Sequence, residues 1–164
     1  MDFLCKQSAK ELADLVRGKD VSSKEVVEAH LNRISEANPY LNVVTLILED
    51  SALKASEIAD NASGSDRQRP FHGIPFSVKE NIDLLGTPTT NGVPFLAEAM
   101  PNRNDPIVDR MIQAGAIPIA RTNMPEMSMR LDTDNPLRGR TKNPWNKNLT
   151  PGGSSGGNAA ALAV

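Results

Sequence analysis

The stretch Thr150-Pro151-Gly152-Gly153-Ser154-Ser155-Gly156-Gly157-Asn158 places two adjacent serines between two pairs of glycines. Glycine adopts backbone angles that other residues avoid, so this loop can hold a serine hydroxyl in an uncommon geometry. A flexible Gly/Ser linker has a similar composition, and a phosphate-binding P-loop would need a lysine after the glycines. Here Trp145, expected to be an aromatic anchor, precedes the loop, and an alanine-rich segment with high helix propensity follows it. The residues alone leave a catalytic or binding loop and a structural turn open.

The composition bounds the class of protein. The 164 residues suffice for one domain, and 18 Lys and Arg against 20 Asp and Glu give a formal net charge of −2. This balance argues against nucleic acid or an anionic membrane as a partner. Cys5 is the only cysteine, which argues against an internal disulfide and a cysteine-rich metal site and favours a reducing, cytoplasmic setting. We expect no metal and no cofactor. We find no apolar signal segment and no stretch long enough to span a bilayer, so we expect a soluble protein.

Capping signals and apolar spacing predict helices that alternate with strands. The first predicted helix is 8–18, with a Ser8/Glu11 capping box. The second opens at Ser22 or Ser23, with Glu25 three residues after Ser22, and Asn38-Pro39 stops it. Two more are predicted, a segment around 52–59 that includes Ile58, and 105–115. Buried strands are predicted at 43–48 and 116–120, and an irregular strand at 71–79 with Lys79 at or near its end. Alternation with short connections predicts an α/β layer architecture whose sheet is at least partly parallel.

The residues available for acyl-transfer chemistry favour a lysine base. Such chemistry combines a hydroxyl or thiol nucleophile with a general base, often histidine. Only His30, expected to pack on a helix face, and His72, in a turn, are present. Burial can lower the pKa of a lysine until a neutral amine is available, and Lys79 follows an apolar approach. For this role the carboxylates of Glu80 and Asp83 should point away from its amine, whereas the alternative is a surface lysine paired with one of them.

Several short segments follow one another in a fixed order. They are Gly-Ile-Pro-Phe-Ser-Val-Lys-Glu-Asn at 73–81, Ala-Gly-Ala at 114–116, Arg-Thr-Asn-Met-Pro-Glu at 121–126, Asn-Pro-Trp at 143–145 and Pro-Gly-Gly-Ser-Ser-Gly-Gly at 151–157. In this order they resemble the amidase signature family, strongly from Phe71 onward and weakly before it. The resemblance implies a partial α/β amidase-signature fold, with a mixed central sheet flanked by helices and truncated before the sheet is complete. Residues 1–164 would then be a single incomplete domain.

The same resemblance implies the chemistry of a Ser, cis-Ser, Lys triad that hydrolyses a small-molecule amide. Its base would be Lys79, its bridging serine Ser154, and the peptide between Gly153 and Ser154 would be cis. Gly153 and Ser155 would support the loop. Ser128 and Ser154 would contact the substrate. Because the family's nucleophilic serine lies further along the chain, and no Ser, Thr or Cys follows Ser155 here, the chain resembles an N-terminal part that is inactive alone.

Other functions stay open at this point. The A-type subunit of an amidotransferase that acts on misacylated tRNA shares these motifs, although Pro125 stands where that subunit generally has Asp. A catalytically inactive interaction fragment would also lack a nucleophile. The segment Ala120-Arg121, where the family commonly has Gly-Lys, is a milder departure. The resemblance is compatible with a homodimer and does not specify which amide is the substrate.

Overall fold

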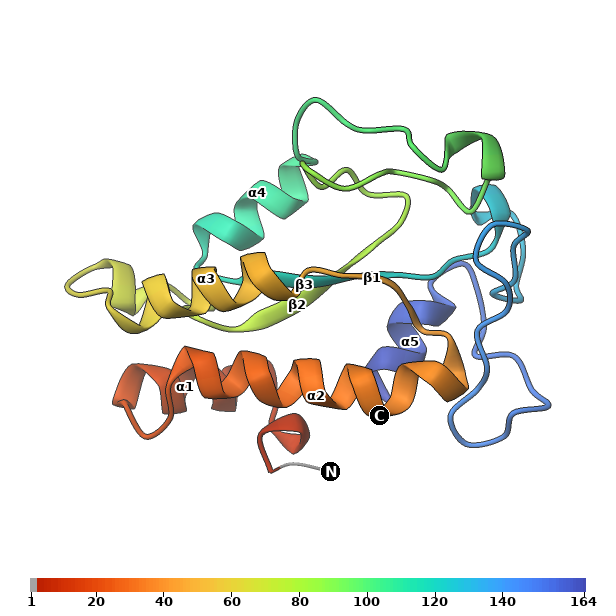
Figure 1. The fold of residues 1–164 in the computed structure, drawn as a ribbon. Helices are drawn as coiled ribbons and strands as arrows, with labels where there is room; N and C mark the ends of the chain where they lie inside the picture. The colour runs from red at the N-terminus through yellow and green to blue at the C-terminus, as the bar shows by residue number, and fades with distance from the viewer. Residues whose placement is uncertain (1–2) are drawn as a thin grey trace. The chain divides into compact units, whose positions relative to one another are not determined.

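The computed structural model describes residues 3–164, in which helices and strands alternate along the chain (Figure 1). The α-helices are α1 (Ala9–Gly18), α2 (Ser23–Leu41), α3 (Glu49–Asp60), α4 (Pro106–Gln113) and α5 (Gly156–Leu162). The strands are β1 (Val44–Ile47), β2 (Pro75–Lys79) and β3 (Ile117–Thr122). Short 3-10 turns lie at Leu4–Lys6, Asp66–Gln68, Pro94–Leu96 and Glu126–Ser128.

The chain packs as two compact units. Unit 1 contains the described chain up to Ser35 together with Leu48–Phe76 and Asp109–Ile119. Unit 2 contains Glu36–Ile47, Ser77–Val108 and Ala120–Val164. The strands β2 and β3 each begin in unit 1 and end in unit 2. That residues 1–164 form a single incomplete domain stays a prediction.

The sheet is mixed, with the strand order β1-β3-β2. β1 pairs antiparallel with β3, and Val44 lies opposite Thr122. Between β3 and β2, the N–H of Ile117 donates to the carbonyl of Ile74 at 2.8 Å, and the N–H of Glu80 donates to the carbonyl of Thr122 at 3.2 Å. Because the partners advance together along both strands, β2 and β3 are parallel. The predicted α/β class with a partly parallel sheet is confirmed.

The capping boxes predicted for the first two helices are confirmed. The Ser8 side chain accepts from the N–H of Glu11, and the Glu11 carboxylate accepts from the N–H of Ser8. Ser22 and Glu25 make the same reciprocal pair before α2. Each box satisfies backbone donors that the first turn of a helix leaves unpaired, which is why these short signals fix the helix starts.

The predicted end of α2 is wrong, because the helix continues through Pro39 to Leu41. Proline has no N–H to donate to the preceding turn, so the helix loses one hydrogen bond at Pro39, but only two residues of the helix follow it. Helical pairing continues beyond the proline, since the N–H of Asn42, directly after the helix, donates to the carbonyl of Asn38 at 2.9 Å. The proline therefore lies inside the helix rather than ending it.

Several burial predictions are also wrong. The sequence predicts a buried strand at 43–48, but only its start is buried, at Val43 and Val44, whereas Leu46 and Ile47 are exposed. The helix predicted around 52–59 is present as α3, and on it Ile58 is exposed while the small residues at positions 52 and 59 are buried. Trp145 is 82% exposed and so does not anchor the serine loop. Apolar character alone does not decide burial at these positions.

The core of unit 1 is an apolar cluster formed by Leu12, Ala13, Val16, Val26 and Ile74. His72 is also buried in this unit, and its Nε2 lies 3.0 Å from the carbonyl oxygen of Ala59. Burial lowers the pKa of His72, and the hydrogen bond to Ala59 offsets this only partly. The structure therefore favours a neutral His72 that donates to Ala59.

We expect acid to destabilise the protein through His72. Its pKa in the unfolded chain is near 6.5, and burial lowers the folded value, so the unfolded chain takes up the proton first. The stabilising contribution is complete above that unfolded pKa and is lost as the pH falls through the folded pKa. Urea unfolding from about pH 7.5 to about pH 5, compared with His72→Gln, measures it, since glutamine can still donate but does not titrate. Equal losses of stability in both proteins would contradict this assignment.

Candidate active site

Lys79 is the last residue of β2, as predicted, and only 8% of its surface is exposed. Its Nζ lies 2.8 Å from the Oγ of Ser154 and 3.1 Å from the Oγ of Ser155. All three residues belong to unit 2. The structure therefore brings together the lysine and both serines that the sequence singled out.

The surroundings of Lys79 favour a neutral amine. Burial lowers the pKa of Lys79. The carboxylate of Glu80 instead pairs with the guanidinium of Arg138 at 3.0 Å, and Asp83 accepts a hydrogen bond from Thr89 at 2.7 Å. Both carboxylates are thus engaged by other residues, as a lysine base requires. An amine in this environment can accept a proton at a pH where an exposed lysine stays charged.

The backbone of the loop that carries the serines packs closely against neighbouring backbone. The Gly153–Ser154 peptide is cis, as the resemblance implied. A Cβ atom on Gly153 would lie 2.4 Å from the carbonyl oxygen of Arg130, so only glycine fits at this position. Ser155 directs its Oγ to the amine of Lys79. That Ser155 and Gly153 support the loop stays a prediction.

The start of α5, just after the serines, lies against Asn123. The N–H of Gly157 donates to the carbonyl oxygen of Asn123 at 3.2 Å, and a Cβ on Gly157 would lie 2.3 Å from that oxygen. Asn123 is fully buried, and its side-chain amide donates to the carbonyl of Gly139 and to the Oγ1 of Thr141, both at 3.0 Å. The helix start is therefore fixed to a residue whose own position is fixed by hydrogen bonds.

Gly157→Ala is expected to destabilise the protein by about 1–3 kcal/mol or more, because backbone must move to admit the methyl group. Helix propensity alone predicts the opposite sign, a gain of about 1 kcal/mol from replacing a glycine inside a helix. Urea unfolding of the purified variant decides between the two. Gly18→Ala is the matched control, because a Cβ there would meet only the flexible side chain of Asp20. A Gly157→Ala protein as stable as the parent would show that this approach is not tight.

Ser128, predicted to contact the substrate, lies in the 3-10 turn Glu126–Ser128 of unit 2. Its backbone has a φ of 59°, in the left-handed region that non-glycine residues seldom adopt. Its Oγ is buried and has no hydrogen-bond partner among the described residues. The structure thus gives Ser128 no hydrogen bond to Lys79 or Ser154, and its contact with substrate stays a prediction.

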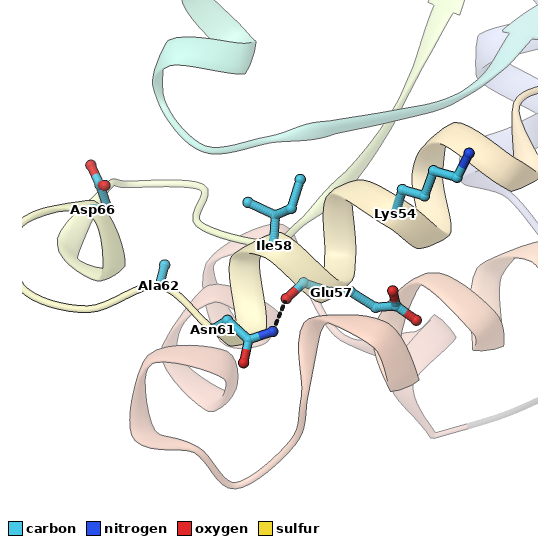
Figure 2. Close-up of a pocket in the computed structure, with 6 residues that line it drawn as sticks. All are labelled: Lys54, Glu57, Ile58, Asn61, Ala62 and Asp66. Atoms are coloured by element: carbon cyan, nitrogen blue, oxygen red, sulfur yellow. Dashed lines mark hydrogen bonds between the residues drawn. The ribbon is translucent and has the colours of Figure 1, made fainter.

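A hollow of about 710 Å³ lies on unit 1, and Figure 2 shows the side chains around it. It is lined by Lys54, Glu57, Ile58, Asn61, Ala62 and Asp66. None of the predicted site residues is among them. Within residues 3–164, no group of three or more His, Cys, Asp or Glu could hold a metal ion, and no helix is long and apolar enough to cross a membrane.

Comparison with known proteins bears on the same residues. The amidase family model matches residues 25–164, which include every residue of the Lys79 site. The chain belongs to the amidase signature family. The indoleacetamide hydrolase of Bradyrhizobium diazoefficiens is one amidase relative, 44% identical over 158 residues that cover 96% of this chain and 30% of that protein. The A-type subunit of the glutamyl-tRNA(Gln) amidotransferase of Acidothermus cellulolyticus is 36% identical over 165 residues, covering 100% of this chain and 33% of that subunit.

Solved structures of amidases give the same result for the fold. The peptide amidase of Stenotrophomonas maltophilia superposes with a TM-score of 0.88 at 28% identity, covering 96% of this chain and 34% of that enzyme. The chain therefore spans about a third of the length of the amidase relatives that it matches. The predicted partial amidase-signature fold is confirmed.

The sequence did not single out the residues that hold the serine loop in place. Asn123 belongs to a motif that carried the resemblance, but its packing against Gly157 was not foreseen. Thr133 and Thr141, both fully buried, lie in a segment without helical or strand periodicity. The signal that could have found them is the density of Asn and Thr between 122 and 141, because these side chains bond readily to loop backbone.

Proposed function

We propose that residues 1–164 supply the general base and the bridging serine of a carboxylic-amide hydrolase. The contact of 2.8 Å between the Nζ of Lys79 and the Oγ of Ser154 carries the proposal. A neutral Lys79 takes the proton of Ser154, and Ser154 takes the proton of the attacking serine as that oxygen adds to the amide carbonyl carbon. The relay then returns the proton to the leaving amine while the C–N bond breaks. Water subsequently cleaves the acyl ester by the same relay.

The attacking serine is proposed to lie outside residues 1–164. No Ser, Thr or Cys follows Ser155 in this sequence, and the chain spans about a third of the length of its relatives. On this proposal the chain alone forms no acyl-enzyme and has no amidase turnover, because a base and a bridging serine lack an atom to attack the carbonyl. The inactive interaction fragment remains the alternative if a completed enzyme is also inactive.

The proposed substrate class is a small carboxamide on an aromatic or apolar acyl group. Its support is the 44% identity to a protein named for indoleacetamide hydrolysis, against 36% to the amidotransferase subunit. Pro125, where that subunit generally has Asp, also favours the hydrolase over transfer to misacylated tRNA. We further propose that the protein is cytoplasmic and acts without nucleic acid or membrane, consistent with its balanced charge and its single cysteine, Cys5.

A chimera tests the proposal. Residues 1–164 are joined to the part of the Bradyrhizobium diazoefficiens hydrolase that follows the aligned region, and ammonia release from indoleacetamide is measured. We expect hydrolysis by the chimera and none by the 164-residue chain. A folded chimera that is inactive while the parent hydrolase is active would contradict the proposal. Steady hydrolysis by the 164-residue chain, unchanged by Lys79→Ala, would contradict the assignment of the triad.

A further inference from the structure

Residues 131–141, called the strap below, form hydrogen bonds to both sides of the candidate active site within unit 2. Near one end, the Oγ1 of Thr133 donates to the carbonyl of Gly152 at 2.8 Å. Further along, Arg138 pairs with Glu80, the residue directly after Lys79. The strap therefore joins the end of the strand that carries the lysine to the loop that carries the serines.

Thr133 contacts the serine loop on both sides of the serine pair. It is fully buried, and its hydrogen bond fixes the peptide carbonyl two residues before Ser154. Its Oγ1 also lies 2.1 Å from the place where a Cβ on Gly156 would be. A single side chain thus holds the backbone that enters the pair and packs against the backbone that leaves it.

The strap itself is fixed, so Thr133 does not simply follow the loop. The side-chain amide of Asn135 donates to the Oδ1 of Asn123 and to the carbonyl of Met124, both at 2.7 Å. The N–H of Thr141 donates to the carbonyl of Thr133 at 2.9 Å, closing the strap on itself. Since these partners follow β3 directly, the strap is tied to the end of the sheet.

We propose that Thr133 is a positioning residue that holds Ser154 against Lys79. The inference rests on the proposed function, because it gives the contact between Lys79 and Ser154 a purpose. Thr133 acts through the Gly152 carbonyl, and no contact with substrate is assigned to it. On this proposal the hydroxyl of Thr133 holds the loop through its hydrogen bond. Valine fills a similar space without donating a hydrogen bond, so it separates the hydroxyl from the shape of the side chain.

The test uses Thr133→Val and Thr133→Ser in the 164-residue chain. The pKa of Lys79 is followed by NMR with isotopically labelled lysine, and Lys79→Arg identifies its signal. We expect Thr133→Val to raise the pKa of Lys79 by at least about half a unit toward its ordinary value, because a displaced loop admits water to the buried amine. Thr133→Ser keeps the donor and is expected to titrate as the parent does. Thr133→Ala removes the same donor and should shift the pKa in the same direction, so the result does not depend on one variant folding.

Thr87→Val is the matched control. Thr87 also lies in unit 2, is buried, and donates through its Oγ1 to a backbone carbonyl, that of Leu84, at 2.8 Å. We expect Thr87→Val to lower the free energy of unfolding about as much as Thr133→Val does, and to leave the pKa of Lys79 unchanged. A Lys79 pKa unchanged in Thr133→Val, or shifted equally in Thr87→Val, would overturn the inference. The proposed function fails by a different result, a normal hydrolysis rate in the Lys79→Ala chimera, so the two failures are distinguishable.

Discussion

Lys79→Ala is expected to slow amide hydrolysis by the chimera about 10²- to 10⁴-fold, the range that a positioned general base supplies. Without the amine, Ser154 has no group to take its proton and so cannot activate the attacking serine. Because Lys79 contacts Ser154 rather than substrate in the proposed relay, kcat should fall while KM changes little. Initial rates of ammonia release over a range of indoleacetamide concentrations separate the two constants.

Lys142→Ala is the control for this variant, since Lys142 is an exposed lysine of the same unit. Its rates should match those of the unmodified chimera. In the unmodified chimera, kcat/KM should rise with pH as Lys79 loses its proton. Because burial lowers the pKa of Lys79, this rise should occur at a pH below the ordinary lysine pKa of 10.5. A Lys79→Ala chimera with near-normal rates, or one whose alkaline rise is unchanged, would make the proposed relay untenable.

The elements that the sequence predicted well are those with a local signal. The two residues of each capping box lie three positions apart, and both Ser8 with Glu11 and Ser22 with Glu25 form the predicted bonds. The position of Lys79 at the end of β2 follows from an apolar run that stops at a charged residue. Such signals depend only on residues that are neighbours in the chain, so they can be read without knowing the tertiary contacts.

The parts that the sequence could not predict depend on residues far apart in the chain. Glu80 was expected only to face away from Lys79, but its partner Arg138 is 58 residues further on. Thr133 meets Gly152 at a separation of 19 residues, within a region that lacks any repeating pattern. Trp145 was expected to anchor the loop because it is large and apolar, but its side chain is exposed. The sequence near a loop residue does not indicate whether other parts of the chain pack over it. These contacts are set by tertiary packing.

Glu80→Gln is expected to lower the free energy of unfolding by about 3 kcal/mol, the lower end of the cost of breaking a buried ion pair. The Glu80 side chain is 1% exposed and accepts from Thr90 at 2.6 Å as well as from Arg138. Arg121, also 1% exposed, depends on the same charge. Burial lowers the pKa of Arg121 to about 10, while Glu80 and Asp83 act to raise it. Glutamine keeps the shape of the side chain but leaves both guanidinium groups without this counter-charge.

Asp132→Asn is the control that shows how much stability is lost when an exposed ion pair, rather than the buried charge of Glu80, is removed. Asp132 pairs with Arg140 at 3.1 Å, but both side chains are nearly half exposed, so water can replace either partner. Such a pair is worth about 0–1 kcal/mol. Urea unfolding of both variants should therefore show a loss several times larger for Glu80→Gln. If the two losses are equal, Glu80 is not the counter-charge on which Arg121 and Arg138 depend. A larger loss of stability for Glu80→Gln, with the pKa of Lys79 unchanged from the parent, would show that Glu80 stabilises the fold and takes no part in proton transfer.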